Sequence, residues 1–343
     1  VNIVLSSPND DNTSKIQGIF ERILKDENKS KINVGYIKEE KGIGKSVEEF
    51  YKVVENNKNI IMKDAPLFID EILGIKDDIE LNAINISSRY SCFLLDYIVK
   101  DFESIIEDGK NVAHDKIIGN IVKLSQKENF VKKFLEKNQK NKIDAIRELF
   151  EIKNNPVIQS GGHYSWDIFE QSDNKKLEKD VIICKSLGSY KEYNTAIIRT
   201  YMIDADKELQ LTYKILLAAF DKLISLLNES IKKSEQTTLG EIYTKVKEFI
   251  ISKDEKLSNC IPDCFGYGIG IEPINDYLKI TEDSKVILTK GMSFFIIIAF
   301  ENIKKNNKDY MLQIGDTIGI NSKKEVINYT GITAKGLNDI YYN

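Results

Sequence analysis

The sequence predicts two lobes, a small α/β lobe followed by a larger α+β lobe. Strand-type and helix-type patterns alternate up to residue 54, and the pattern then breaks before one long helix with an apolar stripe. After Pro156, β-type runs flank a pair of helices. At roughly 150 residues per domain, a chain of 343 residues is long enough for two such units.

The first lobe is expected to span residues 1–74. Two β-type runs alternate with two amphipathic helices, at Val1–Leu5, Ser14–Lys25, Ile32–Ile37 and Val47–Val54. Because the chain opens directly on a strand-type run, we expect this lobe to be truncated and the chain to begin inside a larger protein. The break at Pro66–Asp78 is interpreted as the linker.

The second lobe is expected to span residues 75–343. Its first helices are predicted from apolar periodicity at Ile79–Glu107, Asp115–Ser125 and Asn129–Ile152. Two strands, two helices and five strands are predicted next, at Val181–Cys184, Ile197–Ile203, Leu209–Ser230, Leu239–Ser252, Tyr267–Glu272, Tyr277–Ile280, Ser293–Ala299, Tyr310–Ile314 and Thr317–Ile320. Thr238 and Glu241 form a capping box for the second of these helices. We therefore expect an antiparallel sheet backed by paired helices.

Composition excludes several classes of protein. No apolar run approaches the roughly 20 residues that a membrane span requires, so no membrane partner is expected. A net charge of −4 gives no basic field, which argues against direct sequence-specific binding of nucleic acid. The four cysteines are irregularly spaced, which favours free thiols in a reducing compartment.

Short motifs give no catalytic chemistry by themselves. Gly42-Ile-Gly44-Lys45-Ser46 is similar to part of a P-loop, but Glu39 stands where the full motif needs glycine. The chain has two histidines, His114 and His163, and neither lies near a cysteine in a reactive motif or beside a G-x-S-x-G turn. Acid–base or metal chemistry that relies on two neighbouring histidines is therefore not expected.

A family resemblance rests on five segments in a fixed order: Gln159–Gly162, Arg199-Thr200, Gly266–Glu272, Lys290–Phe294 and Gly315–Thr317. They resemble the pita-bread family, which includes methionine aminopeptidase, aminopeptidase P and creatinase. The first lobe is similar to the N-terminal lobe of aminopeptidase P and creatinase. The resemblance implies a pita-bread, methionine aminopeptidase-like second lobe with pseudo-twofold symmetry.

Active members of this family hold two metal ions with two aspartates, one histidine and two glutamates. The resemblance places those ligands at Ser186, beside Lys185 in a segment that is one residue short, and at Ala196, Tyr267, Ile297 and Gly315. It therefore implies no metal, no cofactor, no catalytic residue and no peptidase activity. We expect the last four positions to converge on one small region.

Among inactive members, the large subunits of FACT-type histone chaperones are the most similar in Pro156–Gly162, Phe265–Glu272 and Ile314–Thr317. The resemblance implies a non-catalytic peptide- or histone-binding module that acts in the nucleus, on the chromosome. It implies a role in nucleosome reorganisation during transcription, replication and repair. The partners implied are histones, either the H3–H4 pair, the pair of H2-type histones or both, and a high-mobility-group-type second subunit engaged through regions outside this chain.

The expected binding surface is the former peptidase cleft. Tyr190, Tyr193 and Tyr267 could offer flat aromatic surface to lysine and arginine side chains, and Glu272 adds negative charge. Equally, Tyr267 could only fill the space that the metals left. Two further interpretations stay open: a rigid scaffold with an unused cleft, or an inactive aminopeptidase-like protein of the proliferation-associated or ribosome-binding type.

Overall fold

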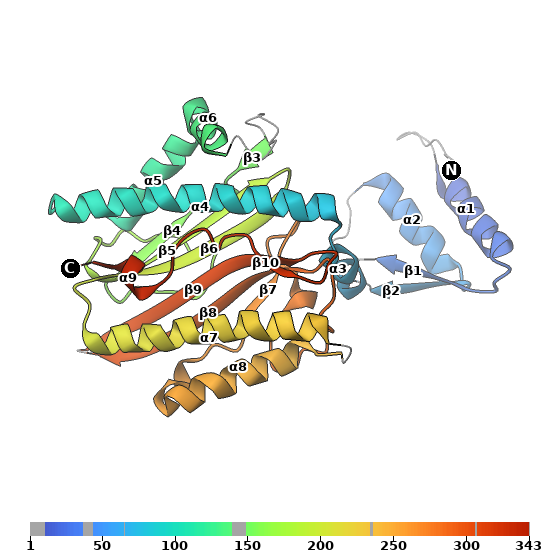
Figure 1. Ribbon diagram of the computed structural model, residues 1–343. Helices are drawn as coiled ribbons and strands as arrows, with labels where there is room; N and C mark the ends of the chain where they lie inside the picture. Colours follow the sequence, from blue (N-terminus) through green and yellow to red (C-terminus); the bar gives the residue numbers. More distant parts are fainter. Residues whose placement is uncertain are drawn as a thin grey trace. The chain divides into compact units, whose positions relative to one another are not determined.

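The computed structural model describes residues 11–36, 44–64, 66–138, 149–233, 236–305 and 307–342 (Figure 1). The chain divides into two units, Val1–Ile69 and Asp70–Asn343. The division falls inside helix α3 (Pro66–Gly74), so the segment expected to be a linker is helical. Apolar residues at Phe68, Ile69, Ile72 and Leu73 have helical spacing, but this stretch is too short for periodicity to be distinctive.

The N-terminal unit is a single strand–helix–strand arrangement preceded by a helix. Its elements are α1 (Thr13–Asp26), β1 (Ile32–Tyr36), α2 (Lys45–Asn56) and β2 (Ile60–Asp64). β1 and β2 pair in parallel, and the crossover between them runs through α2. Phe20, Val53, Val54 and Ile60 form the core. The α/β prediction is confirmed; strand β2 was missed, and the predicted strand at Val1–Leu5 lies outside the described residues.

The C-terminal unit contains six further helices and nine strands among the residues that the structure describes. The helices are α4 (Asp78–Glu107), α5 (His114–Ser125), α6 (Glu128–Lys137), α7 (Lys207–Lys232), α8 (Leu239–Lys253) and α9 (Leu337–Ile340). The strands are β3 (Phe150–Glu151), β4 (Val157–Ser160), β5 (Asp180–Tyr190), β6 (Tyr193–Ile203), β7 (Gly266–Gly268), β8 (Ser293–Lys305), β9 (Lys308–Ile320), β10 (Val326–Asn328) and β11 (Tyr341–Tyr342).

Two long antiparallel hairpins, β5–β6 and β8–β9, form the centre of the sheet. Its strand order is β3-β5-β6-β9-β8-β7, with β4 and β11 paired to β5 and β6, and β10 to β9. The hairpins join where Ile198 of β6 pairs with Gly315 of β9. Helix α4 packs on β5 and β6, and α7 packs on β8 and β9 (Figure 1). A hairpin covered by one long helix therefore occurs twice, as pseudo-twofold symmetry requires.

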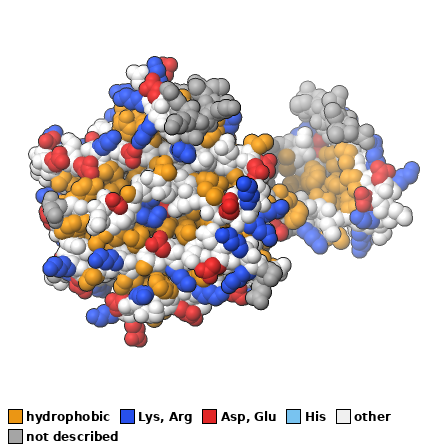
Figure 2. Space-filling view, in the orientation of Figure 1, with side chains coloured by type: hydrophobic (Ala, Val, Ile, Leu, Met, Phe, Trp, Pro, Cys, Tyr) orange, Lys and Arg blue, Asp and Glu red, His pale blue; other side chains and the backbone are white. Residues whose placement is uncertain are grey.

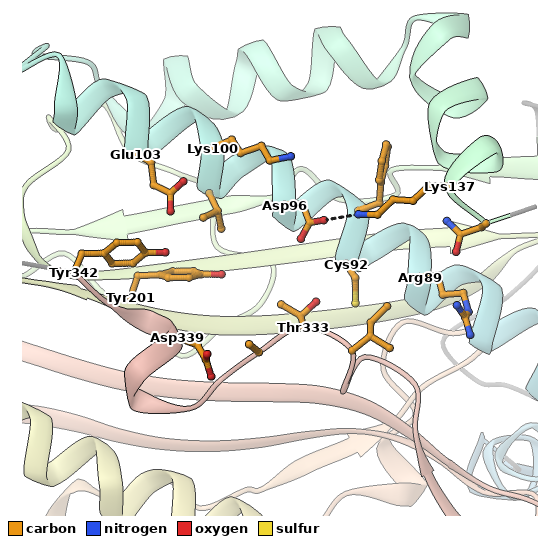
Figure 3. Close-up of a pocket in the computed structure, with 15 residues that line it drawn as sticks. Arg89, Cys92, Asp96, Lys100, Glu103, Lys137, Tyr201, Thr333, Asp339 and Tyr342 are labelled. Carbon is orange, nitrogen blue, oxygen red and sulfur yellow. Dashed lines mark hydrogen bonds and ion pairs between the residues drawn. The ribbon is translucent and has the colours of Figure 1, made fainter.

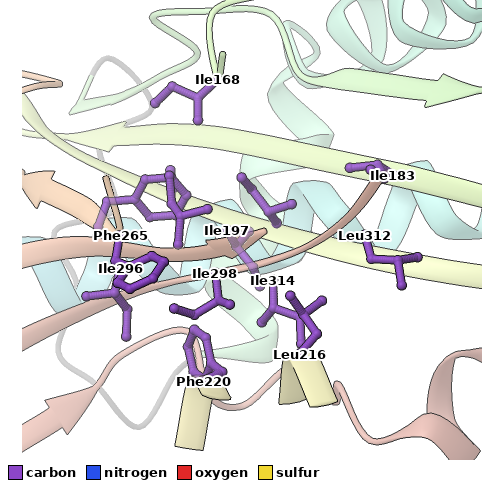
Figure 4. Packing of buried hydrophobic residues seen from close by; sticks show 14 of the residues in the cluster. Ile168, Ile183, Ile197, Leu216, Phe220, Phe265, Ile296, Ile298, Leu312 and Ile314 are labelled. Carbon is purple, nitrogen blue, oxygen red and sulfur yellow. The ribbon is translucent and has the colours of Figure 1, made fainter. Parts of the chain in front are cut away.

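The core lies between this sheet and its two long helices. Leu216 and Phe220 of α7 pack among Ile296, Ile298 and Ile314 (Figure 4). Helix α4 begins at a capping box made by Asp77 and Glu80, and its apolar stripe is buried. The predicted periodicity of both helices is confirmed. No helix in the described ranges is long and apolar enough to cross a membrane.

Five predicted elements need correction. Helix α6 ends at Lys137, and Phe150–Glu151, which was expected to be helical, is strand β3. The expected strand at Tyr277–Ile280 contains a 3-10 helix, Asp276–Leu278. The strand expected at Tyr267–Glu272 is limited to β7. The last two predicted strands are one, β9, because Gly315 and Asp316 stay paired with β8.

Candidate functional site

Four of the five positions at which the resemblance places the metal ligands of active members lie on one face of the sheet. Ile297 of β8 pairs directly with Gly315 of β9. Gly315 pairs in turn with Ile198 of β6, which lies two residues from Ala196 on the same strand. Tyr267 of β7 is opposite Phe295, two residues from Ile297. Directly paired residues, and residues two apart on a strand, share a face. Ala196, Tyr267, Ile297 and Gly315, named here the former metal site, therefore cross four neighbouring strands, roughly 14 Å.

The fifth position, Ser186, lies on the opposite face. Ser186 pairs with Ile197, whereas Lys185 pairs with Ile198 and so shares the face of the former metal site. The assignment of the first ligand to Ser186 is thus corrected: by geometry, Lys185 occupies that place. A shift of one residue along a strand moves a side chain to the other face of the sheet.

Lys185 brings a buried positive charge to the former metal site. Its side chain is fully buried, and its Nζ donates hydrogen bonds to the carbonyl oxygens of Ser165 at 2.5 Å and Asp167 at 2.9 Å. Burial lowers the pKa of the ammonium to about 8, although nearby carboxylates, with that of Asp167 first, act in the opposite direction. An ammonium group now lies on the face where active relatives bind cations.

The segment between β4 and β5 covers the former metal site. The Trp166 ring meets the Tyr267 ring edge to face, with centroids 6.4 Å apart, and Gln313 Nε2 donates to the Trp166 carbonyl at 3.5 Å. Tyr267 is only 2% exposed. Three polar atoms here, Trp166 Nε1, Tyr267 Oη and Gln313 Oε1, are buried without a hydrogen-bond partner in the described part of the chain. The covering segment therefore closes the former cleft, and not every buried polar atom in it has a hydrogen-bond partner.

The side chains at the former metal site do not suit a metal pair. A methyl, a sec-butyl group and a glycine hydrogen offer no lone pair, and the Tyr267 phenol is buried with its pKa raised well above the ordinary value by burial. Among the described residues, no three His, Cys, Asp or Glu side chains cluster as ligands. A Cβ at Gly315 would lie 2.8 Å from the Phe295 ring, so a glutamate at this position would require that ring to move.

A serine–histidine–aspartate chain was missed by the sequence analysis. His114 Nδ1 lies 2.6 Å from Asp173 Oδ1, and His114 Nε2 lies 2.7 Å from Ser160 Oγ. These are the distances of a hydrolase triad, but Ser160 and His114 are 0% and 1% exposed, and Ser160 Oγ also accepts the Glu178 N–H. No substrate reaches this serine, so the chain anchors the covering segment to α5 and β4.

The expected aromatic surface is largely absent. Tyr190 is buried against Phe150, with ring centroids 4.8 Å apart, and Tyr267 is buried as described. Both therefore belong to the core, which corrects the expectation of exposed rings. Tyr193 and Glu272 remain partly exposed, and Tyr193 Oη donates to Glu80 at 2.8 Å.

Tyr193 and Glu272 belong to one acidic edge of the sheet. The adjacent Asn194 donates its side-chain N–H groups to the carbonyl oxygens of Gly270 and Ile271, which fixes the start of β6 beside the segment that holds Glu272. Three more carboxylates come from the capped start of α4. We name this set the acidic edge: Asp77, Asp78, Glu80, Tyr193 and Glu272.

An open groove lies on the other face of the sheet, along α4. Its volume is about 550 Å³, and its walls are one face of α4 and the C-terminal segment 332–342 (Figure 3). Figure 2 shows charges of both signs interspersed with hydrophobic side chains over this side of the molecule. We name this feature the α4 groove.

Comparisons with known proteins agree with this geometry. Residues 109–322 match the model of metallopeptidase family M24.

The FACT complex subunit ctc-2 of Neurospora crassa is 27% identical over 308 residues, 87% of this chain and 29% of that protein. The N-terminal domain of FACT complex subunit SPT16 from Cicer arietinum superposes with a TM-score of 0.81 at 26% identity, covering 100% of this chain and 78% of that one. The corresponding domain from Eremothecium gossypii gives a TM-score of 0.85 at 22% identity, covering 98% and 76%. The chain thus has the pita-bread fold and spans less than a third of the length of its curated relative.

Proposed function

The chain belongs to metallopeptidase family M24, and we propose that within this family it is a non-catalytic, histone-binding module of a FACT-type histone chaperone. Its relatives carry FACT subunit names, and its similarity to their N-terminal domains extends over the whole chain. On this proposal it acts in the nucleus, on chromosomes, in nucleosome reorganisation. A high-mobility-group-type subunit would bind the complete protein through regions outside this chain.

The observation that carries the non-catalytic part of the proposal is Lys185. A metallopeptidase needs carboxylate and imidazole ligands that hold cations and activate water. Here a buried ammonium lies where the resemblance expects an aspartate, and it donates hydrogen bonds to two carbonyl oxygens of the covering segment. Electrostatic repulsion between this ammonium and a divalent cation disfavours metal binding at the same face.

The acidic edge is the surface that we assign to histones, either the H3–H4 pair or the H2-type pair. Four carboxylates and the partly exposed Tyr193 ring lie there, beside the exposed apolar side chains of Ile79 and Ile271. Negative charge with aromatic and apolar surface suits lysine- and arginine-rich segments, and cation–π contact with Tyr193 would add about 0.5–2 kcal/mol. Tyr193 and Glu272 keep the role proposed for them, while Tyr190 and Tyr267 support the fold.

A histone titration tests this assignment. The purified chain is titrated with the H3–H4 complex and with the complex of the two H2-type histones, together with the double variant Tyr193→Ala/Glu272→Ala. We expect the double variant to bind at least about tenfold more weakly at low salt, where rim charges contribute most. Glu248→Ala, which removes an exposed carboxylate on α8, is the matched control and should bind normally.

Three outcomes would count against the proposal. If neither histone complex binds the folded chain, the module is a rigid scaffold with an unused cleft. If the double variant binds as well as the control, the histone surface lies elsewhere. Zinc- or manganese-dependent cleavage of a peptide library, lost with a chelator, would overturn the non-catalytic assignment.

A further inference from the structure

The α4 groove is a long slot with a regular wall. Arg89, Cys92, Asp96, Val99 and Glu103 recur at helical spacing, so they form one face of α4. Fourteen residues separate the first from the last, which gives the wall a length of about 21 Å. The other wall is the segment 332–342, and Tyr201 of β6 lies between the two walls (Figure 3).

The charges that line the groove are separated along its length. Arg89 lies at one end, and Glu103 and Asp339 lie toward the other (Figure 3). Between the two ends, Asp96 is already paired with Lys137 at 3.1 Å. At the acidic end, Glu103 accepts a hydrogen bond from Tyr342. Within the described residues, the guanidinium of Arg89 and the carboxylate of Asp339 have no hydrogen-bond or ion-pair partner. Arg89 and Asp339 therefore offer an unpaired cation and an unpaired anion toward opposite ends of the groove, whereas Lys100 contacts the Tyr97 ring, 5.8 Å from its centroid.

Apolar side chains lie in the middle of the groove, beside the Asp96–Lys137 ion pair. Cys92 is buried with the pKa of its thiol raised to about 12, mainly by burial, so it serves as a small apolar group. Val99 is half-buried in the wall, and Ile332 is 65% exposed on the opposite side. An occupant that covered Ile332 would remove apolar surface from water.

We propose that the α4 groove binds an extended peptide segment of another protein, with an acidic group at one end, a basic side chain at the other and apolar residues between. At about 3.3 Å per residue, six extended residues span the 21 Å wall. Arg89 would bind the carboxylate, and Asp339 with Glu103 would bind the basic side chain. Because three basic and three acidic residues line the groove, a uniformly basic histone tail is a poor match. This site is therefore separate from the acidic edge and does not depend on histone binding.

Synthetic peptides provide a direct test. The probe is fluorescein-labelled Glu-Val-Thr-Ala-Val-Arg with blocked termini, and binding to the whole chain is measured by fluorescence anisotropy at low salt. A peptide of the same composition with adjacent charges, Val-Thr-Glu-Arg-Ala-Val, cannot reach both ends. A third peptide has glutamine at both charged positions. We expect the first peptide to bind at least about tenfold more tightly than either control.

Charge reversals then locate the binding. With Arg89→Glu, both ends of the groove carry a carboxylate, and with Asp339→Lys, both ends carry a cationic group. Each single variant should therefore bind the first peptide about tenfold more weakly. The double variant restores one charge of each sign, and because the peptide can bind in the reverse direction it should recover most of the affinity. Lys256→Glu on the exposed 3-10 helix Glu255–Cys260 is the matched control and should bind normally. Unfolding temperatures check that all variants are folded.

Several results would overturn the proposal. Equal binding of the spaced and adjacent-charge peptides would show that the groove does not distinguish peptides by the distance between their two charges. Unchanged binding in both single variants would place the peptide elsewhere. If Arg89→Glu instead changed the sedimentation coefficient of the chain alone, the groove would be an interface between two copies.

Discussion

The two faces of the C-terminal sheet each bury a cation, and they stabilise it differently. On the face toward α4 and α7, Arg199 Nη2 lies 2.6 Å from Asp316 Oδ1, and its other N–H groups donate to backbone carbonyls, including those of Gly315 and Ala334. On the face of the former metal site, Lys185 donates to two carbonyl oxygens, and no described carboxylate is bonded to it.

The titration of the two groups reflects this difference. Burial raises the pKa of Asp316, but Arg199 and Lys335 outweigh that effect and hold it below the ordinary value. Burial dominates for Lys185, whose pKa falls to about 8. A buried charge with a full set of partners supports the fold, whereas one without a counter-ion costs free energy. The helix-facing side therefore has a complete ionic network, and the other side holds a charge that only backbone carbonyls stabilise directly.

The largest effect is expected from Asp316→Ala. This variant leaves the Arg199 guanidinium and Lys335 without their carboxylate in a buried position, and the loss in free energy of unfolding should be about 3–5 kcal/mol. Denaturant unfolding measures it. Asp309→Ala, an exposed carboxylate on the same strand, should change stability by less than about 0.5 kcal/mol. Equal losses in both variants would mean that the buried carboxylate of Asp316 contributes no more to stability than an exposed one.

A smaller loss is expected from His114→Ala, which tests how the covering segment is anchored. The substitution removes the hydrogen bonds to Asp173 and Ser160 and leaves a buried hydroxyl without its partner. We expect a loss of about 2–3 kcal/mol and faster proteolysis between β4 and β5. The exposed His163 is the control, and His163→Ala should match the unmodified chain in both measurements.

Comparing the pH dependence of stability in the unmodified chain and in Lys185→Met isolates the contribution of Lys185. The folded chain holds this lysine at a pKa of about 8, below its ordinary value of 10.5, so the unfolded chain binds more protons between these pH values. Stability from this group therefore rises with pH. From pH 7.5 to 9 the unmodified chain should gain about 1 kcal/mol relative to Lys185→Met. Parallel stability curves for the two proteins would show that the lysine is solvated.

The smallest effect is expected for Lys185→Met at pH 7. Methionine keeps most of the volume and removes a desolvated charge, while two backbone carbonyls lose a donor. These effects oppose each other, and the free energy of unfolding should change by less than about 1 kcal/mol. Arg199→Met, measured alongside, should lose several times more. A loss of more than about 3 kcal/mol in Lys185→Met would mean that both cations are equally well compensated.

The sequence by itself determined the long helices and the central strands, and through the family resemblance it predicted that the metal ligands are absent. The apolar stripe of α4, the capping box at Thr238, and the ordered motifs around Arg199 and Gly315 are local signals, because helical periodicity and motif spacing depend on neighbours along the chain. Together with the family resemblance they were sufficient for the pita-bread fold, and four of the five positions that the resemblance assigns to ligands share one face of the sheet.

Only the tertiary structure decided which side chains meet. Strand register, not sequence order, puts Lys185 rather than Ser186 at the former metal site, because a slip of one residue reverses the face. Packing of distant segments buried Tyr190 and Tyr267 and joined His114 to Ser160 and Asp173. Such contacts depend on how the sheet pairs and what covers it, and no local pattern records them.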